Sequence, residues 1–235
     1  MLVSAAVCPH PPLLVPAVAG EAAPELDGLR AACDEAVQRL GEADVLVVVG
    51  GAPETRTYGP DAYATLQPYG LSWTVPDHPK DDAEALPLSL SIGRWLLHRQ
   101  DADTDARYEA IAFDAPPEEC LGLGRRLAES AERVALLVMG DGTACRSEKA
   151  PGYLDARAAP YDGAVARALG RADTAALADL DPDLSRELQV AGRAAWQVLA
   201  GAAGGDGFSA GLLADEAPYG VGYFVAAWSR PPYGC

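Results

Sequence analysis

The sequence predicts an α/β fold in which a central, largely parallel or mixed β-sheet is flanked by helices on both faces. The first observation is the order of segments: an apolar run at 2–7, an amphipathic segment at 25–40 and a second apolar run at 44–49. The second is the nearly continuous Val/Leu content of that second run, which is typical of a parallel strand buried on both faces. The third is size, because 235 residues with 49% hydrophobic content suffice for a large core. We therefore expect one domain over residues 1–235.

The remaining elements repeat this alternation of strand and helix. The segment 57–87 is rich in Tyr, Pro, Gly and Asp, which indicates a long excursion with a short strand at 71–75. Asp179, Asp181 and Asp183 indicate a helix-capping turn. A frayed tail is expected at 233–235. The other patterns predict helices at 88–99, 117–131, 160–169, 177–188 and 190–203, strands at 108–114 and 133–139, and two strands joined by a Pro-containing turn between 208 and 228.

Composition excludes several classes of partner. With 34 acidic against 18 basic residues, the net charge of −16 repels phosphate backbones and anionic lipid headgroups, so we expect neither nucleic-acid nor membrane binding. The first apolar run has no basic segment before it and is followed by prolines, which favours neither a signal peptide nor a membrane span. A cytoplasmic location is the expectation. P-loop, GxGxxG, GxSxG and HExxH motifs do not occur in suitable contexts.

The five cysteines are an odd set without a CxxC pair, which fits neither a disulfide framework nor a structural zinc site. Two of them have an alternative to a purely structural role. Cys145 follows a glycine-bearing loop and precedes Arg146, whose charge would favour a thiolate. Cys8 stands two residues before His10, so in an extended segment both side chains face the same way. The full set is Cys8, Cys33, Cys120, Cys145 and Cys235.

His10 lies in the most constrained stretch of the chain, directly after the first predicted strand. Pro9, Pro11 and Pro12 fix their own φ angles and bias the preceding residues toward extended geometry, so the imidazole is held on a stiff backbone. Neutral imidazole is the commonest protein ligand for metals. The alternative is a histidine that packs or hydrogen-bonds in a buried turn.

Four stretches together resemble the class III extradiol dioxygenase, B-subunit-like family, over nearly the whole chain. They are the opening Cys8-Pro-His-Pro-Pro-Leu-Leu14, the strand 45–49 ending in Gly50-Gly51, the loop 139–144 and the ending Glu216-Ala-Pro-Tyr-Gly-Val-Gly-Tyr223. The resemblance implies a non-haem Fe(II) held by two histidines and a glutamate, with a further histidine as acid/base. It places His10 at the first ligand position and Glu216 at the carboxylate.

The sequence departs from the family pattern at two points. The segment after the second strand, GGAPETR, contains no histidine, so Glu54 is the nearest substitute ligand; oxygen ligands suit Fe(II) or Mn(II), and Zn(II) is a further alternative. The loop at 140–161 lacks the acid/base histidine, which leaves Asp141 and Cys145 as candidates for proton transfer. His78 and His98 lie in segments expected at the surface.

Two hypotheses follow. The first is a divergent dioxygenase-like, metal-dependent oxidoreductase that acts on a small aromatic or related molecule with an incomplete iron site. The second is a non-catalytic or differently reactive descendant that binds a small molecule and could be metal-free. Both expect a pocket formed by the His10 turn, 50–56, 141–146 and Glu216, since ligands bind at the carboxyl ends of parallel strands. Relatives often act as oligomers, so a homo-oligomer is also an open alternative.

Overall fold

The backbone is organised around one seven-stranded sheet. The computed structural model describes residues 1–100, 106–205 and 207–231. The strand order is β3-β6-β2-β7-β1-β9-β8. The four central strands β6, β2, β7 and β1 run parallel, while β3, β9 and β8 pair antiparallel with their neighbours. The strands are β1 (Leu2–Cys8), β2 (Val45–Ala52), β3 (Arg56–Tyr58), β6 (Arg107–Ala112), β7 (Val134–Met139), β8 (Ser209–Glu216) and β9 (Tyr223–Ser229).

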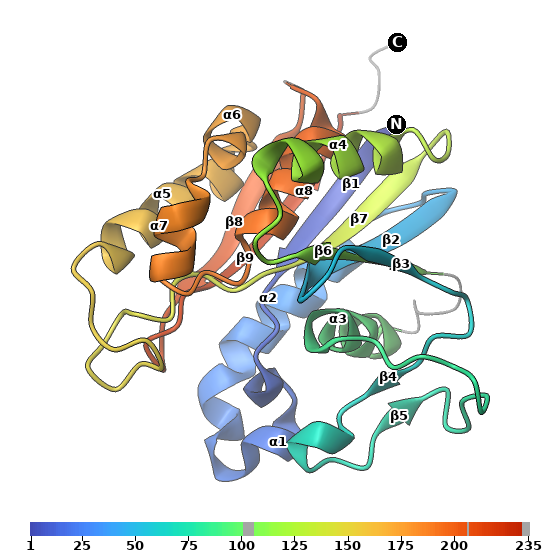
Figure 1. Cartoon of the computed structure of the whole chain (residues 1–235), viewed down its shortest axis with the longest axis horizontal. Coiled ribbons are helices and arrows are strands. Elements are labelled where there is room, and N and C mark those ends of the chain that lie inside the picture. Colours follow the sequence, from blue (N-terminus) through green and yellow to red (C-terminus); the bar gives the residue numbers. More distant parts are fainter. Residues whose placement is uncertain (101–105, 206, 232–235) are drawn as a thin grey trace.

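Helices cover both faces of the sheet (Figure 1). Every residue of β7 is buried, as expected for a parallel strand between two layers. One apolar cluster joins the sheet to α4, α5 and α8, and a second joins its other face to α2 and α3. The α-helices are α1 (Pro16–Ala19), α2 (Asp27–Gln38), α3 (Leu88–His98), α4 (Pro117–Ala128), α5 (Ala158–Arg171), α6 (Thr174–Ala178), α7 (Pro182–Glu187) and α8 (Arg193–Ala203).

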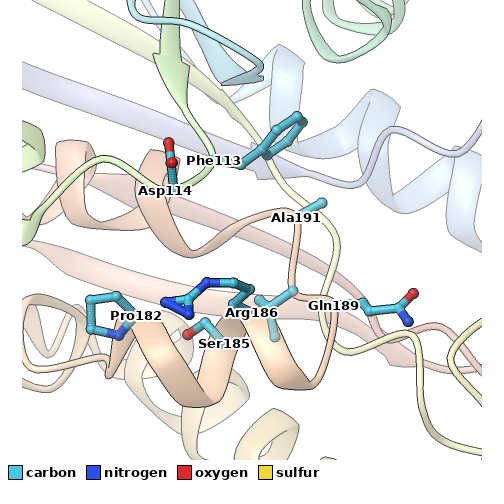
Figure 2. A pocket seen from close by; sticks show the side chains of 8 residues that line it. Phe113, Asp114, Pro182, Ser185, Arg186, Gln189 and Ala191 are labelled. Carbon is cyan, nitrogen blue, oxygen red and sulfur yellow. The ribbon is translucent and has the colours of Figure 1, made fainter.

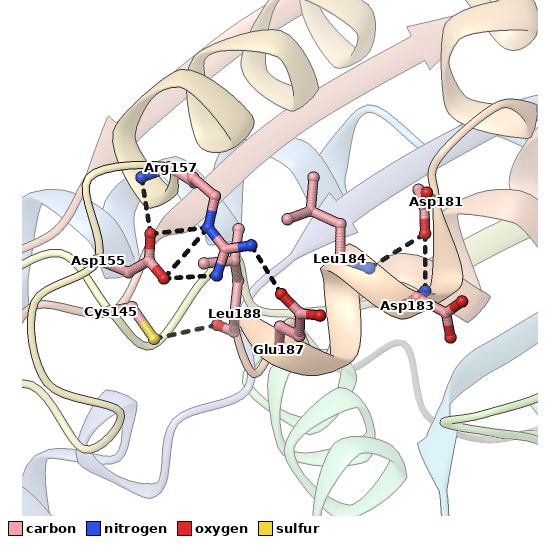
Figure 3. A network of polar contacts seen from close by, with 8 residues as sticks. All are labelled: Cys145, Asp155, Arg157, Asp181, Asp183, Leu184, Glu187 and Leu188. Carbon is pink, nitrogen blue, oxygen red and sulfur yellow. Dashed lines mark hydrogen bonds and ion pairs between the residues drawn. The ribbon is translucent and has the colours of Figure 1, made fainter.

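The sequence-based prediction of a mixed α/β sheet with helices on both faces is confirmed, with local differences. The short strand expected at 71–75 is limited to β5 (Thr74–Val75), which pairs with β4 (Ala64–Thr65) apart from the main sheet. The single helix expected at 177–188 is two short helices, because Asp181 caps α7 by accepting hydrogen bonds from the Asp183 and Leu184 amides (Figure 3). The tail at 233–235 lies outside the described residues.

None of the helices in the described ranges is long and apolar enough to cross a bilayer.

The topology brings the candidate segments to one edge. The four parallel strands end on the same side of the sheet, where β1 leads to His10, β2 ends at Ala52, β6 is followed by Phe113 and β7 by Gly140. The antiparallel strand β9 begins at this edge with Tyr223. Residues from distant parts of the chain can therefore meet here.

Candidate functional site

His10 and Asp141 lie in direct contact at the carboxyl edge of the sheet. The His10 backbone amide donates a hydrogen bond of 2.7 Å to Asp141 Oδ1, and His10 Nδ1 lies 3.7 Å from the same oxygen. The pairing of β1 with β7 causes this contact, because their last residues, Cys8 and Met139, are paired, and His10 and Asp141 each lie two positions beyond the end of their strand. The expected meeting of the His10 turn and the Asp141 loop is thus observed.

The two nitrogens of the imidazole have different surroundings. Nδ1 is buried and has no hydrogen-bond partner, and its distance to Asp141 is longer than a hydrogen bond. Nε2 also has no partner among the described residues but, unlike Nδ1, is not fully buried. The ring therefore points Nδ1 toward a carboxylate and leaves Nε2 as the atom that another molecule can reach.

Burial of the Asp141 side chain raises the pKa of this carboxyl, and the adjacent His10 lowers it only in part. Asp141 is 9% exposed. Its backbone is also fixed, because its carbonyl accepts a hydrogen bond of 2.8 Å from the Gly192 amide at the start of α8. The carboxyl group is thus held in place and is a stronger base than a solvent-exposed aspartate.

Tyr223 is a further polar group at this edge. Tyr223 begins β9, which pairs with β1 up to Val7 and Ala226, and it lies near Asp141. The tyrosine is buried, and burial together with the neighbouring Asp141 raises the pKa of its hydroxyl. The sequence contains a signal for this residue, since it ends the motif at 216–223, but its role cannot be assigned without the strand register.

A buried carboxylate fixes the loop that carries Asp141. Asp162 of α5 is fully buried and accepts hydrogen bonds from the Thr143 amide and hydroxyl and from Arg146, each at 2.9 Å. Burial raises the pKa of Asp162, and these three donors lower it in part. The contact requires Gly142, because a Cβ there would lie 2.8 Å from an Asp162 oxygen. Asp162 escapes sequence-based detection because nothing in its helical pattern shows its partner 19 residues earlier.

The environment of Cys145 differs from the one expected from the sequence. Arg146 turns to Asp162, and the Cys145 thiol instead donates to the Gly152 and Leu188 carbonyls. Figure 3 shows the contact with Leu188. Burial raises the pKa of Cys145, so the predicted thiolate-promoting effect of Arg146 is not observed. This surrounding favours a neutral thiol.

Cys8 is fully buried and lies close to Cys33 of α2, whose pKa is raised chiefly by burial.

The remaining candidate ligands lie apart from the pair. Glu54 is exposed, with one carboxylate oxygen 3.7 Å from Arg56 Nη1. Glu216 is exposed on β8 and pairs with Tyr223 of β9, so that it lies two strands away from β1. Within 1–100, 106–205 and 207–231, no three His, Cys, Asp or Glu side chains gather in a way that could hold a metal ion. His78 is exposed, as expected.

Comparisons with known proteins show a fold relationship. The fold resembles the crystal structure of the uncharacterized protein JW3007 from Escherichia coli K12, with a TM-score of 0.61, 16% sequence identity, and coverage of 97% of this chain and 99% of that one. No family model matches the chain, and no curated protein matches its sequence. The relationship therefore extends over nearly the whole fold and carries no stated activity.

Proposed function

We propose that this protein is a divergent relative of the class III extradiol dioxygenases that binds a small phenol-like molecule at the carboxyl edge of the sheet and removes a proton from it. His10 Nε2 accepts the proton, and Asp141 stabilises the imidazolium that forms. The proposal combines the sequence motifs with the fold and with the contact between these two residues.

The orientation of His10 carries the proposal. A carboxylate on the Nδ1 side with an unpartnered Nε2 is the arrangement by which an aspartate orients a histidine that acts as a base. The separation of 3.7 Å leaves room for the pair to tighten once a ligand is bound, as acid/base contacts commonly do. Proton transfer by a positioned group contributes roughly 10²–10⁴-fold to a rate.

The residues present do not fit the iron site of the family. One imidazole and one carboxylate meet, and that carboxylate already accepts the His10 amide. Glu54 is in contact with Arg56, and Glu216 lies two strands away from β1. We therefore assign no step to Fe(II), Mn(II) or Zn(II), and the metal-dependent oxidoreductase is the competing hypothesis.

Binding of catechol, monitored by ultraviolet difference spectroscopy at neutral pH, tests the proposal. We expect bound catechol to show the red-shifted absorbance of the ionised phenol with wild-type protein. His10→Gln should abolish this signal and Asp141→Asn should reduce it, while the exposed-site control His78→Gln should leave it unchanged. Catechol that binds in its neutral form, or an ionised signal that survives His10→Gln, would contradict the proposal.

The same proteins distinguish the metal-dependent alternative. Each is incubated aerobically with Fe(II) and catechol, and the yellow ring-cleavage product is measured against Fe(II) alone. We expect no turnover above this background. Turnover that requires both Fe(II) and His10 would favour the oxidoreductase and replace the metal-free proposal.

A further inference from the structure

A pocket of about 270 Å³ lies between the end of β6 and the segment that joins α7 to α8. Phe113 and Asp114 form one wall, and Arg186, Gln189 and Ala191 form the other (Figure 2). Val190 also lines the pocket. The site does not include His10 or Asp141, so it goes beyond the proposed function.

The size and lining of the pocket suit a single ring. A cavity of about 150 Å³ can hold benzene, so this volume accommodates a ring with one substituent. Phe113 is 45% exposed although it is large and apolar. Its ring packs on Gly51, where a Cβ would lie 2.5 Å from a ring carbon. With Pro182, Val190 and Ala191, this aromatic ring gives the pocket its apolar surface.

A buried cation lies directly behind the Phe113 wall. The Arg193 guanidinium, in a residue only 2% exposed, donates to the Phe113 and Ala115 carbonyls at 2.6 and 2.5 Å. Its other partners are the Gln197 amide and the Cys120 thiol. Burial raises the pKa of Cys120 to about 11, despite Arg193, so this thiol is neutral. No carboxylate pairs with Arg193 in the described chain, so its charge is stabilised by neutral acceptors alone.

A buried charge without an ionised partner is costly, and an anion nearby reduces that cost. The Arg193 Nε–H also has no hydrogen-bond partner. Arg186 adds a second cation on the opposite wall, where its only ion pair within the described chain is the exposed contact with Asp183 of the same helix. An exposed pair of this kind is weak enough to be exchanged for a ligand.

The other polar groups in the wall do not favour a cation. The Ser185 hydroxyl is already bonded to Tyr161 and to the Asp181 carbonyl. Asp114 is the acidic group of the lining, and in Figure 2 its carboxylate points away from α7. Gln189 adopts a left-handed backbone with φ of 55° because α7 ends there in a Schellman motif, in which the Val190 amide donates to the Ser185 carbonyl. Its side-chain amide has no hydrogen-bond partner within the described chain.

We propose that this pocket binds a small monocyclic aromatic carboxylate, with the ring against Phe113 and the carboxylate on Arg186. Arg193 attracts the anion through the Phe113–Ala115 turn without touching it. The class of ligand follows from one aromatic wall, a volume that admits one ring, and two cations that face or underlie it.

Benzoate is the test probe, and benzylamine, which has a similar ring and the opposite charge, is its matched control. Binding is followed by chemical-shift changes of the Phe113, Val190 and Ala191 amides through the millimolar range. We expect saturable benzoate binding and at least about tenfold weaker benzylamine binding, since about 1.4 kcal/mol separates affinities by a factor of ten.

Four variants locate the contacts, and a fifth serves as a control. Arg186→Gln should weaken benzoate binding roughly three- to tenfold, as expected for loss of an exposed charge contact. Phe113→Leu should weaken it also, because the aromatic wall is lost. Asp183→Asn should preserve or strengthen binding by freeing Arg186, and Asp114→Asn should strengthen it by removing a like charge. His10→Gln should have no effect, which separates this test from that of the proposed function.

Several results would overturn the inference. These are no saturable benzoate binding in the millimolar range, benzylamine binding as tight as that of benzoate, shifts confined to other regions, or affinity that is unaffected by Arg186→Gln. Because Phe113 and Arg186 are both exposed, their variants are expected to fold, and the unchanged shifts of distant amides check this.

Discussion

Asp141 is the residue whose ionisation most directly reports on the candidate site. Its pKa is raised from the ordinary value of 3.8, so the folded state holds the proton more tightly than the unfolded state. The free energy of unfolding then falls as pH rises through the unfolded pKa toward the folded one. Asp141→Asn removes this penalty and retains an oxygen that can accept the His10 amide. We therefore expect the variant to gain stability relative to wild type as pH rises above about 4.

Urea unfolding at a series of pH values measures this difference. Asp162 has a pKa raised by burial as well, but it is present in both proteins and its contribution cancels. A stability difference that shrinks with rising pH would mean that His10 lowers the pKa of Asp141 below its ordinary value. A difference that does not vary with pH would mean that Asp141 is unperturbed.

Single residues could be predicted from the sequence where the backbone was constrained nearby. The prolines around His10 and the glycines beside Asp141 marked both as residues that follow strands, and the parallel pairing of β1 and β7 brings them together. The environment of Cys145 could not be predicted in this way. It depends on Asp162, a distant residue that attracts the neighbouring Arg146.

Helices α4 and α8 pack closely against each other, and two glycines permit this contact. A Cβ on Gly124 would lie 2.0 Å from the Val198 carbonyl oxygen, and one on Gly201 would lie 2.3 Å from that of Leu121. Both obstacles are helix backbone, so the helices themselves would have to separate. This packing positions the start of α8, where Gly192 binds the Asp141 carbonyl.

We expect Gly124→Ala to lower the free energy of unfolding by about 1–3 kcal/mol, as overpacking typically does. Gly122→Ala is the matched control in the same helix. Its Cβ would meet only the flexible ends of Arg126 and Arg125, so the better helix propensity of alanine should stabilise the protein by up to about 1 kcal/mol. Chemical denaturation measures both. Equal effects of the two substitutions would contradict the close helix approach.

The elements that the sequence did not predict are those whose partners are distant or whose length is short. β3 spans only three residues and is defined by its pairing with β6, about 50 residues later, so no local pattern identifies it. The long strands and amphipathic helices were predictable because the spacing of their apolar residues indicates which faces are buried. The break between α6 and α7 also had a local signal, since Asp181 and Pro182 are favoured at the start of a helix.

At the scale of the whole molecule, the parallel order of the central strands accounts for the position of the candidate site. Four parallel strands must end at one edge, so residues that follow each strand meet there whatever their separation in sequence. The neighbouring pocket could not be predicted, because it needs the turn after β6 and the segment between α7 and α8 to face each other. Neither segment has a sequence pattern that indicates the other as its neighbour.

Net charge is a property of the whole molecule with a measurable effect on stability. With 34 acidic and 18 basic residues, the chain carries −16, and compaction brings these like charges together. Salt screens interactions beyond about 10 Å at 0.1 M, so NaCl should weaken this repulsion more than the short ion pairs. We expect the melting temperature at neutral pH to rise by roughly a few degrees between about 0.01 and 0.3 M NaCl.

The same measurement of melting temperature against NaCl concentration at pH 4.4, close to the isoelectric point, is the internal control. There the net repulsion vanishes, and the salt-dependent stabilisation should vanish with it. Exposed ion pairs such as those of Arg56 with Glu84 and Arg157 with Glu187 act in the opposite direction, because salt weakens them. A melting temperature that falls with salt at neutral pH would show that these local attractions outweigh the repulsion of the excess acidic charge.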